Sequence, residues 1–132
     1  MSEHQDFQAG ERWSYRTVTG YEDSRLVVGA VLRFTEDEPI VCCAVTGAPR
    51  KLPDGRLDTV TIPFLPIRAS ALTSTVLARD GHAEPPPAFM PAFEAWSDDP
   101  RGLSAFTVPF DGRLDTLIAR QMAEIVGRRG VG

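Results

Sequence analysis

The sequence predicts an α+β fold: a curled, mostly antiparallel sheet of about five strands, with two short helices and one C-terminal amphipathic helix. Three observations support this class. Alternating or continuously apolar segments fill the first half of the chain, the period changes to that of a helix after residue 66, and an amphipathic stripe ends the chain. Strands followed by helix-rich segments are typical of α+β domains. The N-terminal strands form a meander that can curl toward a barrel.

The first two strands are expected at 10–18 and 25–34, joined by turn residues as an antiparallel hairpin. The first alternates strictly between two sets of side chains: Trp13, Tyr15 and Thr17 against Arg12, Ser14 and Arg16. It is therefore predicted to be half-buried. The second is apolar on both parities, as in a strand that is covered on both faces or bent at Gly29.

Two more strands are expected at 40–46 and 57–64, with a loop at 47–55 between them. In the second of these strands, Val60, Ile62 and Phe64 share one face. Pro63 removes a backbone donor, which favours an edge strand or the end of a strand.

The neighbouring Cys42 and Cys43 lie inside the 40–46 strand. We expect two buried, reduced thiols on opposite faces, because side chains alternate along a strand and a bond between neighbours does not fit ordinary disulfide geometry. A vicinal redox pair is the alternative.

The second half of the chain should be richer in helix. A short helix is predicted through 71–79, with Ser70 as its N-cap and Gly81 as its stop. Prolines keep 80–91 extended until a one-to-two-turn helix begins at Pro91 and places Phe93 and Trp96 at i and i+3. A fifth strand is expected at 103–110. A final helix from 111 or 112 to about 127 should dock its apolar stripe on the sheet: Leu114, Leu117, Ile118, Met122, Ile125 and Val126.

The segment Asp-Gly-Arg-Leu-Asp-Thr occurs twice, at 54–59 and at 111–116. The first copy precedes a Pro-Phe strand and the second follows one, whereas a duplicated unit should keep its order. We interpret the match as a coincidence.

Length and composition predict one domain at 10–132, preceded by a flexible tail at 1–9. No apolar run is long enough for a membrane span, and the N-terminus does not read as a signal peptide. The net charge of -4 argues against nucleic acid and anionic membranes as partners. Lys51 is the only lysine among fourteen basic residues, a bias expected of a GC-rich bacterium. We therefore expect a cytoplasmic bacterial protein.

No motif points to a particular chemistry. The chain lacks a serine elbow and a phosphate-binding glycine loop, and its histidines, His4 and His82, have no metal-ligand spacing. We expect no cofactor and no metal, and the sequence leaves open whether the protein is an enzyme.

The candidate binding residues are an aromatic and arginine set: Trp13, Tyr15, Arg16, Phe89, Met90, Phe93 and Trp96. Core packing is the simpler explanation of the large apolar members. An anion-binding face of Arg12 and Arg16 with Arg25 or Arg33 is a further hypothesis, and pairing of these arginines with Glu11, Glu22 or Asp23 is its alternative.

These observations favour a non-enzymatic domain that acts by binding or self-association. We expect a homodimer whose interface includes the 85–96 connection or the C-terminal helix, because a proline-rich connection with this aromatic content leaves apolar surface uncovered. The alternative is a small enzyme or ligand-binding protein with an aromatic pocket for a small molecule under the 82–101 connection.

Overall fold

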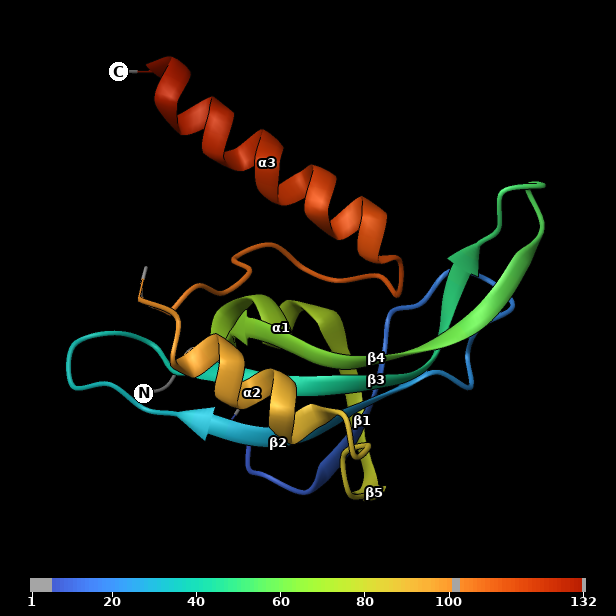
Figure 1. Cartoon of the computed structure of the whole chain (residues 1–132), viewed down its shortest axis with the longest axis horizontal. Coiled ribbons are helices and arrows are strands. Elements are labelled where there is room, and N and C mark those ends of the chain that lie inside the picture. The colour runs from blue at the N-terminus through green and yellow to red at the C-terminus, as the bar shows by residue number, and fades with distance from the viewer. Residues whose placement is uncertain (1–5, 101–102, 132) are drawn as a thin grey trace.

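The computed structural model describes residues 6–100 and 103–131 and shows the predicted α+β class (Figure 1). Its elements are, in chain order, β1 (Glu11–Tyr15), β2 (Arg25–Leu32), β3 (Ile40–Lys51), β4 (Leu57–Arg68), α1 (Ala69–Thr75), β5 (Val76–His82), α2 (Phe89–Ser97) and α3 (Leu114–Val131). The strands form one antiparallel sheet in the order β4-β3-β2-β1-β5. The sheet curls but does not close, so β4 and β5 are its two edges.

The predicted N-terminal meander is confirmed. β1 pairs with β2 through Trp13 and Leu26, and β2 pairs with β3 through Val28 and Cys43. The loop expected at 47–55 is shorter than predicted, because residues 48–51 continue β3 and pair with the first residues of β4. This long β3–β4 hairpin projects from one end of the sheet (Figure 1).

β4 is an edge strand, as its proline predicted, but Val60, Ile62 and Phe64 do not share one face. The register pairs Val45 with Ile62 and Cys43 with Leu65, so β4 carries one extra residue between them. Such a bulge shifts the alternation of side chains. Ile62 therefore enters one hydrophobic cluster and Phe64 packs against the other.

The helix expected through 71–79 ends at Thr75, and the following residues form the fifth strand. Val76 pairs with Tyr15 of β1, and Leu77, which was expected inside the helix, is 59% exposed. Ser70 is not the N-cap either, because Arg68 holds that position and makes no side-chain capping bond. The pairing with β1 replaces the helical bonds after about two turns.

Residues 103–110 are not a strand, contrary to the prediction. The segment makes a single parallel bridge from Phe106 to Ile67, with Arg68 N donating to Phe106 O and Phe106 N to Pro66 O. Pro109 cannot donate a ladder bond. The segment instead runs between the sheet and α3 (Figure 1).

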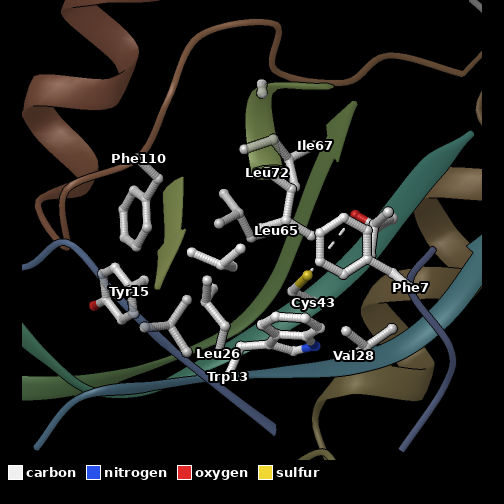
Figure 2. Packing of buried hydrophobic residues seen from close by; sticks show 14 of the residues in the cluster. Phe7, Trp13, Tyr15, Leu26, Val28, Cys43, Leu65, Ile67, Leu72 and Phe110 are labelled. Atoms are coloured by element: carbon white, nitrogen blue, oxygen red, sulfur yellow. Dashed lines mark hydrogen bonds between the residues drawn. The ribbon is translucent and has the colours of Figure 1, made fainter. Parts of the chain in front are cut away.

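Two hydrophobic clusters cover the two faces of the sheet. The larger one fills the concave face beneath α1 and the 103–117 segment and includes Phe7, Trp13, Tyr15, Leu26, Val28, Cys43, Leu65, Ile67, Leu72 and Phe110 (Figure 2). The smaller one lies under α2 and includes Ile40, Cys42, Ala44 and Phe89. Because Phe7 is 2% exposed, packed structure begins before Gly10, within the expected tail.

The two cysteines are free and buried, as predicted. Cys43 belongs to the concave cluster and Cys42 to the cluster under α2, so their side chains point to opposite faces of β3. Burial raises the pKa of Cys42 to about 12, and it raises the pKa of Cys43 as well. Both thiols therefore stay protonated at neutral pH, which disfavours nucleophilic or redox chemistry.

Candidate functional site

Trp13 and Tyr15, two of the predicted binding residues, are core residues. Trp13 is 7% exposed, lies edge-on to Phe7 with ring centroids 5.2 Å apart, and donates from Nε1 to Oε1 of the buried Glu11 at 3.2 Å. Arg79 Nη1 approaches Glu11 Oε2 at 3.1 Å and compensates its charge. Trp13 is therefore enclosed by contacts within its own chain and offers no surface to a ligand.

Tyr15 connects β1 to the segment that precedes α3. Its ring stacks on Phe110 with centroids 5.5 Å apart, and its hydroxyl lies 2.6 Å from Ser24 Oγ. Since Ser24 donates its only hydroxyl proton to Thr46 O, Tyr15 is the donor in this pair. Burial is the main cause that raises the pKa of Tyr15 to about 12.

Phe89, Phe93 and Trp96 do come together, on α2, and the residue that completes the group is Phe64. The Phe64 ring centroid lies 5.7 Å from Phe89, 6.3 Å from Phe93 and 5.4 Å from Trp96. Trp96 also donates from Nε1 to Ser104 O at 2.7 Å. The β4 bulge that turns Phe64 to this face has no clear pattern in the sequence apart from Pro63.

A glycine on β2 makes room for the α2 cluster. A Cβ atom at Gly29 would overlap Cζ of Phe89, so the ring of Phe89 occupies the space above a backbone without a side chain. β2 also changes register between Val28 and Ala30, which fits the predicted bend. The 82–101 connection thus fills its own face of the sheet with Phe89, which is 1% exposed.

The remaining predicted binding residues lie apart from these clusters. Met90 points outward from α2 and is 52% exposed. Arg16 is exposed just after β1. The seven candidates therefore divide between the concave core, the α2 cluster and the surface, and they do not form one site.

Two of the arginines expected to bind an anion, Arg12 and Arg25, contact Asp80, an acid that the sequence analysis had not named as their partner. Arg25 Nε lies 2.7 Å from Asp80 Oδ2, and Arg12 donates from Nε to Asp80 O at 2.8 Å. The hydrogen bond from Arg25 is the main cause that lowers the pKa of Asp80. Asp80 comes into reach because β5 pairs with β1. Arg33 approaches Asp6 at 3.1 Å instead.

The largest departure from the sequence prediction is α3. Of its apolar stripe, Leu117 alone is fully buried in the described part of the helix. Four other members lie four residues apart along the helix and are 38, 48, 56 and 62% exposed: Leu114, Ile118, Met122 and Val126. We call these four the α3 apolar face. The stripe does not dock on the sheet, because the 103–113 segment lies between them (Figure 1).

That segment holds α3 along the side of the helix next to the α3 apolar face. Gln121 Oε1 accepts from Thr107 N at 2.7 Å, and Arg120 approaches Asp111 at 3.5 Å. Phe110, which is 2% exposed, and the buried Leu117 anchor the first turn of the helix in the concave cluster. The helix is thus placed by one side and leaves the α3 apolar face uncovered.

A groove of about 680 Å³ opens between the β3–β4 hairpin and the start of α3. Both copies of the repeated segment line it. Each copy makes the same turn: Asp54 Oδ1 accepts from Arg56 N at 3.0 Å, and Asp111 Oδ1 accepts from Arg113 N at 3.1 Å. The glycine that follows each aspartate has a positive φ, 89° at Gly55 and 98° at Gly112. The repeat therefore encodes a shared local turn.

The titratable side chains that the structure describes are paired with arginines or at least partly exposed, or are the two buried thiols and Tyr15, and they form no metal-binding group. No three His, Cys, Asp or Glu side chains in the described residues are grouped to hold a metal ion. His82 is exposed at the end of β5, and His4 lies outside the described residues. None of the described helices is both long enough and apolar enough to cross a membrane.

Comparisons with protein-family models, with characterised proteins and with solved structures find no match for this chain. Its function must therefore be argued from its own surface.

Proposed function

We propose that this domain acts by self-association, and that two copies pair through the α3 apolar face. The observation that carries the proposal is the row of four large apolar side chains on α3 whose exposure rises from 38% at Leu114 to 62% at Val126. Single exposed apolar residues are ordinary on protein surfaces, but a contiguous row marks an interaction site.

A second copy of the chain is the occupant that the helix fits. Side chains four residues apart form a ridge, and ridges of this kind pack into the grooves of a similar helix. A two-fold axis that pairs the helices antiparallel brings the opposite ends of their helix dipoles together.

The size of the face sets the expected strength of the dimer. An 18-residue helix is roughly 27 Å long and offers one apolar row, less than the about 800 Å² per partner of a standard stable interface. We therefore expect a reversible dimer with a dissociation constant in the micromolar range. The α2 side of the 85–96 connection contributes less, because Met90 is its one large apolar side chain with more than a third of its surface exposed.

The expected cytoplasmic and bacterial setting belongs to the same proposal. Two buried free thiols are usual in a reducing compartment.

Light scattering across a dilution series tests the dimer. The wild-type chain should change from about twice the monomer mass to the monomer mass as it is diluted, and Ile118→Glu and Met122→Glu should stay monomeric throughout. Ala123→Glu adds the same charge at an exposed position of α3 outside the row of four and should dimerise like the wild type. Circular dichroism verifies that each variant is folded.

Two outcomes would overturn the proposal. A wild-type mass that stays monomeric up to several hundred micromolar excludes the dimer. A dimer that survives Met122→Glu but is lost in Met90→Glu assigns the interface to the connection instead. Trp96 is a poor site for this test, because it packs against Phe64 and Phe93 in its own chain.

A further inference from the structure

The groove between the β3–β4 hairpin and α3 combines apolar walls with one unmatched positive charge. Its two rims carry Leu57 and Leu114, the equivalent leucines of the repeated segment, which are 56 and 38% exposed. Val60, Ile62 and the prolines at 49 and 63 continue the apolar wall. A volume of about 680 Å³ is in the range of sites that bind small molecules.

The charged groups of the groove cancel in pairs except for one. Arg50 approaches Asp58 at 3.2 Å, and Arg113 approaches Asp115 at 3.5 Å. Lys51, the only lysine of the chain, lines the groove and is exposed, and it makes no ion pair with any residue in the described ranges. It stands opposite Leu57 in the β3–β4 ladder, so the two side chains lie on the same face of the hairpin.

We infer that this groove binds a small molecule with an elongated apolar body and a single carboxylate, with the body between Leu57 and Leu114 and the carboxylate at Lys51. The apolar body would cover two leucines that the fold leaves exposed. One negative charge matches the one unpaired ammonium, whereas the two charges of a phosphate monoester would leave one without a partner.

The repeated segment accounts for how the groove is held open. Both turns are fixed by the positive φ of the glycine and by a hydrogen bond that the aspartate accepts from the backbone N–H two residues later. A side chain at position 112 would in addition meet the Tyr15 hydroxyl at 3.1 Å and Pro49 Cδ at 3.2 Å. Each rigid turn thus places its leucine at the rim of the groove, Leu57 at the start of β4 and Leu114 at the start of α3.

Decanoate is a suitable probe, and NMR titration of the labelled wild-type chain is a direct measurement. Decanoate should bind saturably in the sub-millimolar to millimolar range, as ligand efficiency allows for a molecule of this size. The amide shifts should centre on Lys51, Leu57 and Thr61. Decyltrimethylammonium should bind much more weakly, because Lys51 repels its charge.

Matched variants separate the two halves of the site. Leu57→Asp should weaken decanoate binding by at least about tenfold, because it removes apolar contact and adds a like charge. Leu77→Asp, at an equally exposed leucine on β5 away from the groove, should have no effect. Lys51→Ala should weaken binding by about threefold at low salt, the scale of an exposed ion pair, while Arg33→Ala should not.

The groove shares Leu114 with the α3 apolar face, but the ligand site and the dimer can fail separately. Binding should persist in Met122→Glu, which alters the α3 apolar face but not the groove. Shifts confined to Ile118, Met122 and Val126, or equal affinity in Leu57→Asp and Leu77→Asp, would overturn the site. Binding of decyltrimethylammonium as tight as that of decanoate would overturn the role of Lys51.

Discussion

The two longer helices, α2 and α3, both carry large apolar side chains, but the fold covers one set and leaves the other exposed. Phe89 of α2 is 1% exposed, whereas Met122 of α3 is 56% exposed. The sequence had suggested the reverse, with the proline-rich connection uncovered and the last helix docked. An apolar pattern therefore identifies a face that is expected to be buried, but it does not say whether the covering surface belongs to the same chain.

The difference comes from what lies beneath each helix. α2 meets a sheet face with a recess, because Gly29 carries no side chain and the β4 bulge brings Phe64 alongside. α3 meets the 103–113 segment, which already occupies the space next to β4 and presents hydrogen-bonding groups such as Thr107. Among the described side chains of α3, Leu117 alone belongs to the concave cluster.

The largest expected effect is at the buried aromatic of α2. Phe89→Ala should destabilise the fold by about 3 to 5 kcal/mol, because it removes a fully buried ring and leaves a cavity against Gly29. The neighbouring Met90→Ala should change stability by less than about 0.5 kcal/mol, since Met90 is mostly outside the packing. Urea denaturation measures both, and equal losses at the two positions would contradict the close fit of α2.

Two adjacent residues of α3 test whether the helix is placed by one side. Leu117→Ala should cost about 2 to 4 kcal/mol, because its side chain is fully buried in the concave cluster. Ile118→Ala should cost less than about 0.5 kcal/mol when measured at concentrations where the chain is monomeric, because the side chain is 48% exposed. A large loss at Ile118 under those conditions would mean that the stripe docks on its own sheet after all.

The recess in β2 gives the third test. Gly29→Ala should destabilise the fold by about 2 to 3 kcal/mol, because the new methyl group overlaps the Phe89 ring. Phe89→Leu is smaller at the contact, so the double variant should be less destabilised than the sum of the two single losses. Additive losses in chemical denaturation would show that Gly29 matters for the backbone bend alone.

The parts of the fold that the sequence predicted are those where local pattern and tertiary environment agree. The strict alternation around Trp13 and the unbroken apolar run around Cys42 each admit one arrangement, a half-buried and a doubly covered strand, and both were found. The fate of Leu77 was ambiguous, because Val76 and Leu77 fit a helical stripe as well as a strand. Pairing with β1, a contact distant in sequence, decided the matter.

The candidate site was harder to predict because it depends on what remains uncovered. The aromatic residues were correctly weighed as core candidates, yet the groove could not be foreseen from them. Its one sequence signal was the repeated Asp-Gly-Arg-Leu-Asp-Thr, which was interpreted as a coincidence because the flanking elements differ. The structure shows that the repeat encodes a turn, and a turn can lead into a strand at Leu57 and into a helix at Leu114.

The smallest effect we expect compares the two faces of the sheet through the adjacent thiols. Burial raises the pKa of Cys42 to about 12 from an ordinary value of 9.0, and the pKa of Cys43 is also raised. Between pH 9 and 12 the unfolded chain loses a thiol proton that the folded chain keeps, so stability is present below pH 9 and falls as the pH rises. Each thiol should therefore lower the free energy of unfolding by about 1.4 kcal/mol between pH 8 and pH 10.

Denaturation of Cys42→Ala and Cys43→Ala at both pH values should show that each variant loses the same share of this pH dependence. The shares are equal because α2 covers Cys42 as completely as the concave cluster covers Cys43. If Cys42→Ala alone kept the pH dependence of the wild type, α2 would open from the sheet and the two faces would not be equally closed.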